Sequence, residues 1–159
     1  MAGIKRYQDL ECHQLAVQIR REVLRVTRRE VVRRDYRFVH QIRDSARGAP
    51  RNIAEGYSRF NPAEIIPFLS YAKGSLDETQ NHVEDGGEAG YLTTEETEHL
   101  LGLIARAIGA VTRWMAYLES PAARRFYEQF KNRRRNTPYE PRSTRAPRTG
   151  TKNPEPGRT

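Results

Sequence analysis

Apolar residues recur along most of this chain at spacings of three and four, the period of an α-helix that buries one face. The first such stretch covers about residues 9–29, and Asp9 is a candidate N-cap for it. The second covers about residues 38–59. In it, Gly48 and Pro50 predict a kink or a short break, because proline lacks a backbone donor and clashes with the preceding turn. No stretch shows the sustained alternation of a β-strand.

A third helical stretch covers about residues 61–85. It opens with Asn61-Pro62-Ala63-Glu64, which predicts an N-cap, a proline at the first helical position and a capping-box glutamate. Gly86-Gly87 is expected to end this helix. Pro67 lies inside the pattern, so either the regular helix begins near Ile66 or its first turn is distorted.

The fourth helical stretch covers about residues 94–119. Thr93 and Glu96 form a second capping box, and Pro121 is expected to end the helix. Four long helices joined by short links predict an all-α fold, an antiparallel up-down-up-down four-helix bundle. The residues expected to face its core are Cys12, Leu15, Ala16, Ile19, Val23, Val26, Phe38, Ile42, Ala46, Ala49, Ile53, Tyr57, Ile65, Leu69, Ala72, Leu76, Thr79, Val83, Leu100, Ile104, Ala107, Val111, Met115 and Leu118.

The composition of the chain changes after Ser120. Residues 1–120 are expected to form the bundle domain, and residues 121–159 a basic tail that holds six of the nine prolines. Within the tail, residues 122–135 predict a short basic helix. Residues 136–159 have too few apolar side chains to offset the entropy of ordering, so they are expected to be disordered.

The formal net charge of +8 is unevenly distributed. Residues 1–59 contain 14 Lys/Arg and 7 Asp/Glu, residues 60–120 contain 3 and 10, and residues 121–159 contain 11 and 3. The basic surplus favours nucleic acid as a partner over an anionic membrane surface, the third alternative being a solvated tail without function. The split also predicts that the positive part of one copy contacts the negative part of another.

A second, narrower apolar stripe recurs every seven residues on the first and fourth helices, away from their core faces. One interpretation is a broad core face. The other is a contact between subunits, which the charge split favours. The stripe residues expected at an oligomer interface are Leu10, Val17, Leu24, Leu103 and Tyr117.

The sequence offers poor signals for catalysis. Lys73-Gly74-Ser75 lacks the upstream glycine of a phosphate-binding loop, and no serine lies in a nucleophile elbow. The single Glu96-x-x-His99 pair falls short of a di-iron bundle site, which needs two such pairs. We therefore expect no enzymatic activity, no cofactor and no metal.

Cysteine usage and hydropathy bear on location. Cys12 is the single cysteine, so an internal disulfide is impossible and a reducing compartment is favoured. No apolar run approaches the roughly 20 residues of a membrane helix, and the N-terminus lacks the apolar segment of a signal peptide. We expect a cytoplasmic protein without a membrane partner.

Arginine supplies the candidate binding site. Glu22 and Glu30 are the two acids between positions 20 and 34, so this segment is more one-sided than an ordinary solvated face. Guanidinium groups suit phosphates, but no nucleic-acid domain signature predicts base-specific recognition. The residues expected to contact nucleic acid are Arg21, Arg25, Arg28, Arg29, Arg33, Arg34, Arg133, Arg134 and Arg135.

A family likeness is carried by the segment 41–56, and above all by Pro50-Arg51-Asn52-Ile53-Ala54-Glu55-Gly56. This segment resembles the hallmark of the bacterial four-helix-bundle proteins, also called 23S rRNA intervening-sequence proteins. Residues 64–78, Gly90-Tyr91-Leu92 and Tyr7-Gln8-Asp9-Leu10 agree with the same family, so the resemblance covers about residues 5–119. The motif residues are Pro50, Asn52, Ile53, Ala54, Glu55, Gly56, Gly74 and Ser75.

The small and polar residues of the motif favour a structural interpretation. Gly56 and Gly74 predict close approach of helices, and Asn52 and Glu55 are expected to bond neighbouring turns or to lie at a boundary. A pocket built on Asn52 and Glu55 is the alternative.

The resemblance implies a four-helix bundle that assembles as a ring of five and has no established catalytic activity. Relatives include the accessory variability determinant of diversity-generating retroelements, a basic pentamer that works with a reverse transcriptase and its template RNA. We therefore expect a homopentamer that binds nucleic acid, with RNA favoured. The alternatives are an adaptor ring that docks a reverse transcriptase or another enzyme, and a structural oligomer with no nucleic-acid role.

Overall fold

The computed structural model describes residues 6–59 and 61–136, and the side chains of residues 130–136 lie outside that description. Every regular element in these residues is a helix, so the all-α prediction is confirmed. The predicted disorder of residues 136–159 falls, from residue 137 on, outside the described part. The elements are η1 Tyr7–Asp9, α1 Glu11–Val26, α2 Glu30–Arg33, α3 Tyr36–Tyr57, α4 Pro62–Glu88, α5 Thr94–Glu119 and α6 Pro121–Asn136.

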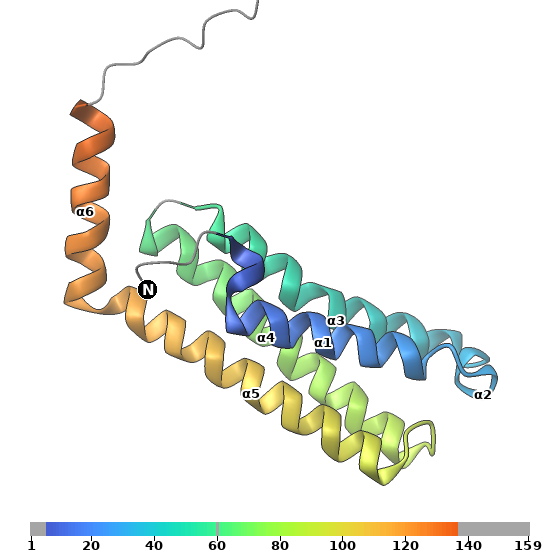
Figure 1. Cartoon of the computed structure of the whole chain (residues 1–159). Helices are drawn as coiled ribbons and strands as arrows, with labels where there is room; N and C mark the ends of the chain where they lie inside the picture. The colour runs from blue at the N-terminus through green and yellow to red at the C-terminus, as the bar shows by residue number, and fades with distance from the viewer. Residues whose placement is uncertain (1–5, 60, 137–159) are drawn as a thin grey trace, which may run out of the picture.

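Four long helices lie side by side, and each packs against two others (Figure 1). α1 packs against α3 and α5, and α4 packs against the same two helices. Consecutive long helices run in opposite directions in Figure 1, which follows from the short links between them. α6 leaves the end of α5 at a steep angle and contacts both α5 and α4.

The core lies between these four helices and consists of the residues that the helical period selects. All the predicted core residues are buried except Tyr57 and Met115, which are half-buried and pack against the core. Each fully buried Leu or Ile contributes roughly 1.5–3 kcal/mol of hydrophobic free energy. Three further residues are buried although the helical period did not select them. They are Val32 and Leu92, near helix ends, and Trp114, on a broader face of α5.

Both internal prolines lie inside continuous helices. α3 runs through Pro50 without the predicted break, and α4 begins at Pro62 and runs through Pro67. The Pro50 side chain is itself buried, so hydrophobic burial offsets part of the cost of the missing backbone donor. Of the predicted kink or short break at Pro50, the break is therefore absent, because tertiary packing outweighs the local penalty.

Two helix ends differ from the prediction. Asp9 lies in η1 and pairs with Arg6, so the N-cap position of α1 is Leu10. α4 continues past Gly86-Gly87 to Glu88, and Gly90 makes the turn with φ of 72°. The backbone N–H groups of Tyr91 and Gly90 donate to the Gly86 and Gly87 carbonyls, 2.8 and 3.1 Å away, which is a Schellman ending.

The N-caps of α4 and α5 follow the prediction, but Glu64 accepts from the Asn61 side chain and not from the Asn61 backbone N–H as a capping box requires. The Asn61 side chain accepts from the Glu64 backbone N–H, and Pro62 is the first residue of α4. Thr93 and Glu96 form the reciprocal capping box of α5, whose bounds match the predicted stretch. The predicted basic helix after Ser120 is α6.

Candidate nucleic-acid interface

Exposed arginines line the part of the molecule formed by α1, α2 and α3. The guanidinium groups of Arg21, Arg28 and Arg33 make no hydrogen bond or ion pair with any residue that the structure describes. Within the same limits Arg47 and Arg51 on α3 are also exposed and unpaired, although the sequence analysis did not select them. Their spacing of four on the outer face of an amphipathic helix is the signal that identifies them.

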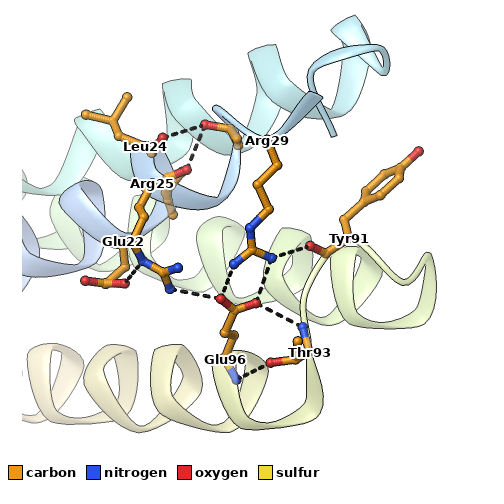
Figure 2. A network of polar contacts seen from close by, with 9 residues as sticks. Glu22, Leu24, Arg25, Arg29, Tyr91, Thr93 and Glu96 are labelled. Carbon is orange, nitrogen blue, oxygen red and sulfur yellow. Dashed lines mark hydrogen bonds and ion pairs between the residues drawn. The ribbon is translucent and has the colours of Figure 1, made fainter. Parts of the chain in front are cut away.

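Arg25 and Arg29 do not belong to this free set. Both extend from the C-terminal end of α1 toward Glu96 in the first turn of α5 (Figure 2). Arg25 lies 3.0 Å from the Glu96 carboxylate and 2.8 Å from that of Glu22. Arg29 donates through both Nη atoms to Glu96 and through Nη1 to the Tyr91 carbonyl. Carboxylates of the same chain therefore already occupy the guanidinium groups at these two of the predicted contact positions.

Glu96 is the centre of this network. Its side chain is 16% exposed. Hydrogen bonds from Arg29, from the Thr93 backbone N–H and from Arg25 lower the pKa of the carboxyl group to about 2, although partial burial opposes the shift. A carboxylate held by two guanidinium groups stays ionised at neutral pH, so it ties the end of α1 to the start of α5.

Arg34 and the tail arginines have a different status. Arg34 pairs with Glu30 at 2.9 Å, with both side chains more than two-thirds exposed. A pair of this kind contributes little to stability and exchanges readily for another anion. The structure describes the backbone of Arg133, Arg134 and Arg135 as part of α6, and their side chains are outside the described part.

Acidic residues gather on the opposite helices, α4 and α5. Glu84, Glu88 and Glu98 line a shallow surface hollow where α4 turns into α5. Asp77 and Glu95 are also exposed on these two helices. The positive part of the sequence therefore corresponds to α1–α3, and the negative part corresponds to α4 and α5.

The residues of the second apolar stripe divide into two groups. Leu10 and Leu103 are buried within the chain itself, as a broad core face would have them. Val17, Leu24 and Tyr117 are half-buried. Leu24 lies with Arg21, Arg25 and Arg28 around a shallow hollow on α1, so the apolar stripe and the basic face meet there.

The motif residues lie where α3 packs against α4. Ile53 is fully buried, Pro50 and Gly56 are buried, Asn52 and Ala54 are half-buried, and exposed Glu55 pairs with Arg59 one turn later. A Cβ at Gly56 would lie 3.1 Å from Phe68 Cβ, so close approach there is confirmed. Gly74 has open space around it, so the same expectation was wrong at Gly74.

The second close approach of α3 and α4 is instead at Gly48 and Ser75. A Cβ at Gly48 would lie 2.8 Å from Ser75 Cβ. One turn away, the Thr79 hydroxyl donates to Ser45 Oγ at 3.1 Å, and both residues are buried. The motif segment therefore makes a tight helix pair.

A motif arginine that the sequence analysis did not select connects α3 to α1. Arg43 donates through Nε to Thr27 Oγ1 at 2.7 Å and through Nη2 to the Thr27 carbonyl at 3.0 Å. Thr27 follows the last residue of α1, so Arg43 satisfies a carbonyl at the end of that helix. Sequence spacing alone does not show this contact, because the two residues meet only after α1 and α3 pack.

The described residues form neither a metal-ligand cluster nor a membrane span. No three His, Cys, Asp or Glu side chains come together there as they do around a metal ion. None of the described helices has the length and hydropathy required to cross a lipid bilayer.

A family model described as 23S rRNA-intervening sequence protein matches residues 8–112. No curated protein sequence matches the chain. The matched segment covers well over half of the chain, and it contains the motif, the Glu96 network and the arginines of α1–α3. The chain belongs to the 23S rRNA-intervening sequence protein family.

Proposed function

We propose that this protein is a non-enzymatic, oligomeric four-helix bundle of up-down-up-down topology that binds nucleic acid, with RNA as the favoured partner. The observation that carries the proposal is the exposed arginine face of α1–α3. Arg21, Arg28 and Arg33 have no carboxylate partner among the described residues, while the acids gather on α4 and α5. The tail adds 11 Lys/Arg against 3 Asp/Glu. Arginine forks bind phosphate oxygens in two places at once.

Binding of this kind rests on counterion release and depends steeply on salt. For single-stranded nucleic acid, the logarithm of affinity falls with the logarithm of salt by about 0.7 for each phosphate contact. Arg25 and Arg29 contribute less than their neighbours, because Glu22 and Glu96 already pair with them. The binding surface is therefore narrower than the run of arginines in the sequence.

The test is a triple replacement, Arg21→Gln, Arg28→Gln and Arg33→Gln, measured by titration with a labelled RNA at several salt concentrations. We expect the salt slope to fall by about 2 and the affinity at low salt to fall at least tenfold. Thermal stability should not change, since these side chains hold no described partner.

The matched control is Arg106→Gln, an exposed arginine on α5. Loss of that charge should leave affinity nearly unchanged. An unchanged salt slope in the triple variant would contradict the arginine face. Absence of RNA binding at any salt would favour the adaptor alternative, in which the ring docks a reverse transcriptase or another protein.

Self-association is the second part of the proposal. The family resemblance favours a ring of five, and the separation of charge between α1–α3 and α4–α5 supplies unlike surfaces for a head-to-tail contact. The half-buried side chains of Val17, Leu24 and Tyr117 are candidates for apolar contacts in the same interface.

A further inference from the structure

The connection between α1 and α3 carries a second feature beside its charge. We call residues 28–37 the tip. Tyr36, the first residue of α3, leaves 82% of its surface exposed, and Val31 in α2 leaves 70% exposed. Large apolar side chains exposed to this degree without a partner indicate a binding surface when they cluster.

The tip is positively charged because it contains five arginines and two acids, and both acids already have partners within the chain. Glu30 pairs with Arg34. Asp35 accepts from the Phe38 backbone N–H at 3.0 Å and from the Tyr91 hydroxyl at 3.1 Å. The Arg28 and Arg33 side chains have no partner among the described residues.

The tip is also held in place, which lowers the cost of binding. Val32, within the tip, is buried, with 1% of its surface exposed. Asp35 caps α3 and accepts a hydrogen bond from the hydroxyl group of Tyr91, which lies in the turn between α4 and α5. Phe38 packs against the Tyr91 ring. A backbone held in this way gives up little further conformational freedom when a ligand arrives.

We propose that the tip binds single-stranded RNA, with one unpaired base stacked on the Tyr36 ring and the flanking phosphates on Arg28 and Arg33. An exposed aromatic ring among arginines is the arrangement that single-stranded nucleic-acid surfaces use, because every base presents a flat face and every nucleotide a phosphate. A protein partner would favour a wider apolar patch than one ring and one valine. This inference rests on the proposed function and names its substrate class.

The test compares Tyr36→Ala with wild type on two probes, an oligouridylate of about 12 nucleotides and a blunt RNA duplex of the same length. Loss of one stacked base should weaken binding to the single strand roughly tenfold. Binding to the duplex should not change, since paired bases are unavailable for stacking. Tyr36→Phe should keep wild-type affinity, because stacking needs the ring and not the hydroxyl group.

Two controls separate the outcomes. Tyr71→Ala removes a tyrosine that is 62% exposed on α4, away from the arginine face, and should bind both probes as wild type does. When the complex with an oligonucleotide that carries 5-iodouracil is irradiated, the oligonucleotide should crosslink to Tyr36. Equal losses on both probes for Tyr36→Ala, or no loss on either, would overturn the tip assignment while leaving the arginine face standing. Failure of wild type to bind either probe would overturn both and favour a protein at the tip.

Discussion

At the residue scale, Glu96 shows how one side chain serves several contacts. It accepts from the Thr93 backbone N–H as the partner in a capping box, and it binds the guanidinium groups of Arg25 in α1 and Arg29 just before α2. The capping role follows from local spacing. The ion pairs follow from packing that joins residues separated by 67 and 71 positions. These pairs divide the arginines of α1 and the residues after it into a group bound within the chain and a free group.

Replacement Glu96→Gln tests this division. We expect the free energy of unfolding to fall by about 1–2 kcal/mol at pH 7, because the variant keeps a capping oxygen but loses the charge that Arg25 and Arg29 bind. The measurement is chemical denaturation followed by circular dichroism.

The pH dependence gives a sharper test of the same contact. The folded pKa of Glu96, about 2, is lower than the ordinary value of 4.5. Its contribution to stability is therefore fully present above pH 4.5 and is lost as pH falls toward 2. The difference between wild type and Glu96→Gln should shrink over that range. A difference that is constant from pH 7 to pH 2.5 would contradict the ion-pair account.

At the element scale, α3 combines a proline and two glycines that sequence rules treat as helix breakers. The helix persists because its buried face packs against α4 along its length. Gly48 and Gly56 allow the two helices to approach where a side chain would collide. The small residues of the motif therefore act through the distance between α3 and α4.

The variant Gly48→Ala should destabilise the protein by roughly 1–3 kcal/mol, because the added methyl group meets Ser75 Cβ at 2.8 Å. This cost outweighs the gain of up to about 1 kcal/mol that alanine brings to a helix. The matched control is Gly74→Ala, which adds a methyl group to open space and should stabilise the protein. Thermal unfolding measures the stability of both variants. Equal shifts of their unfolding temperatures would contradict the close approach of the two helices at Gly48.

At the scale of the whole molecule, charge is separated between two pairs of helices. The free arginines lie on α1, α2, α3 and their connections, and the acidic hollow of Glu84, Glu88 and Glu98 lies on α4 and α5. A molecule with such opposed surfaces can use one for a polyanion and the other for a second copy of itself.

Light scattering at micromolar concentration tests the assembly. We expect a mass near five times the 18.4 kDa of one chain in dilute salt. The double variant Glu88→Lys and Glu98→Lys should lower that mass, because it removes the negative surface that a neighbouring copy contacts. Glu119→Lys, at the far end of α5, is the control and should leave it unchanged. A single-chain mass for wild type would remove the proposal of a ring.

The amino-acid pattern by itself determined the four long helices, most of the core and two of the caps. These features depend on residues within one or two turns, so periodicity and capping rules suffice. The family motif was also visible in the sequence, because its residues are contiguous.

Tertiary structure alone decided the rest. It kept α3 whole through Pro50, moved the close approach from Gly74 to Gly48 and placed Leu10 and Leu103 inside the subunit. It also bound Arg25 and Arg29 to Glu96 while it left Arg21, Arg28 and Arg33 unpaired among the described residues. The physical reason is the same in each case. The contribution of a proline, a glycine or a charged residue to the free energy of folding depends on the neighbour that packing brings to it. That neighbour lies far away along the chain.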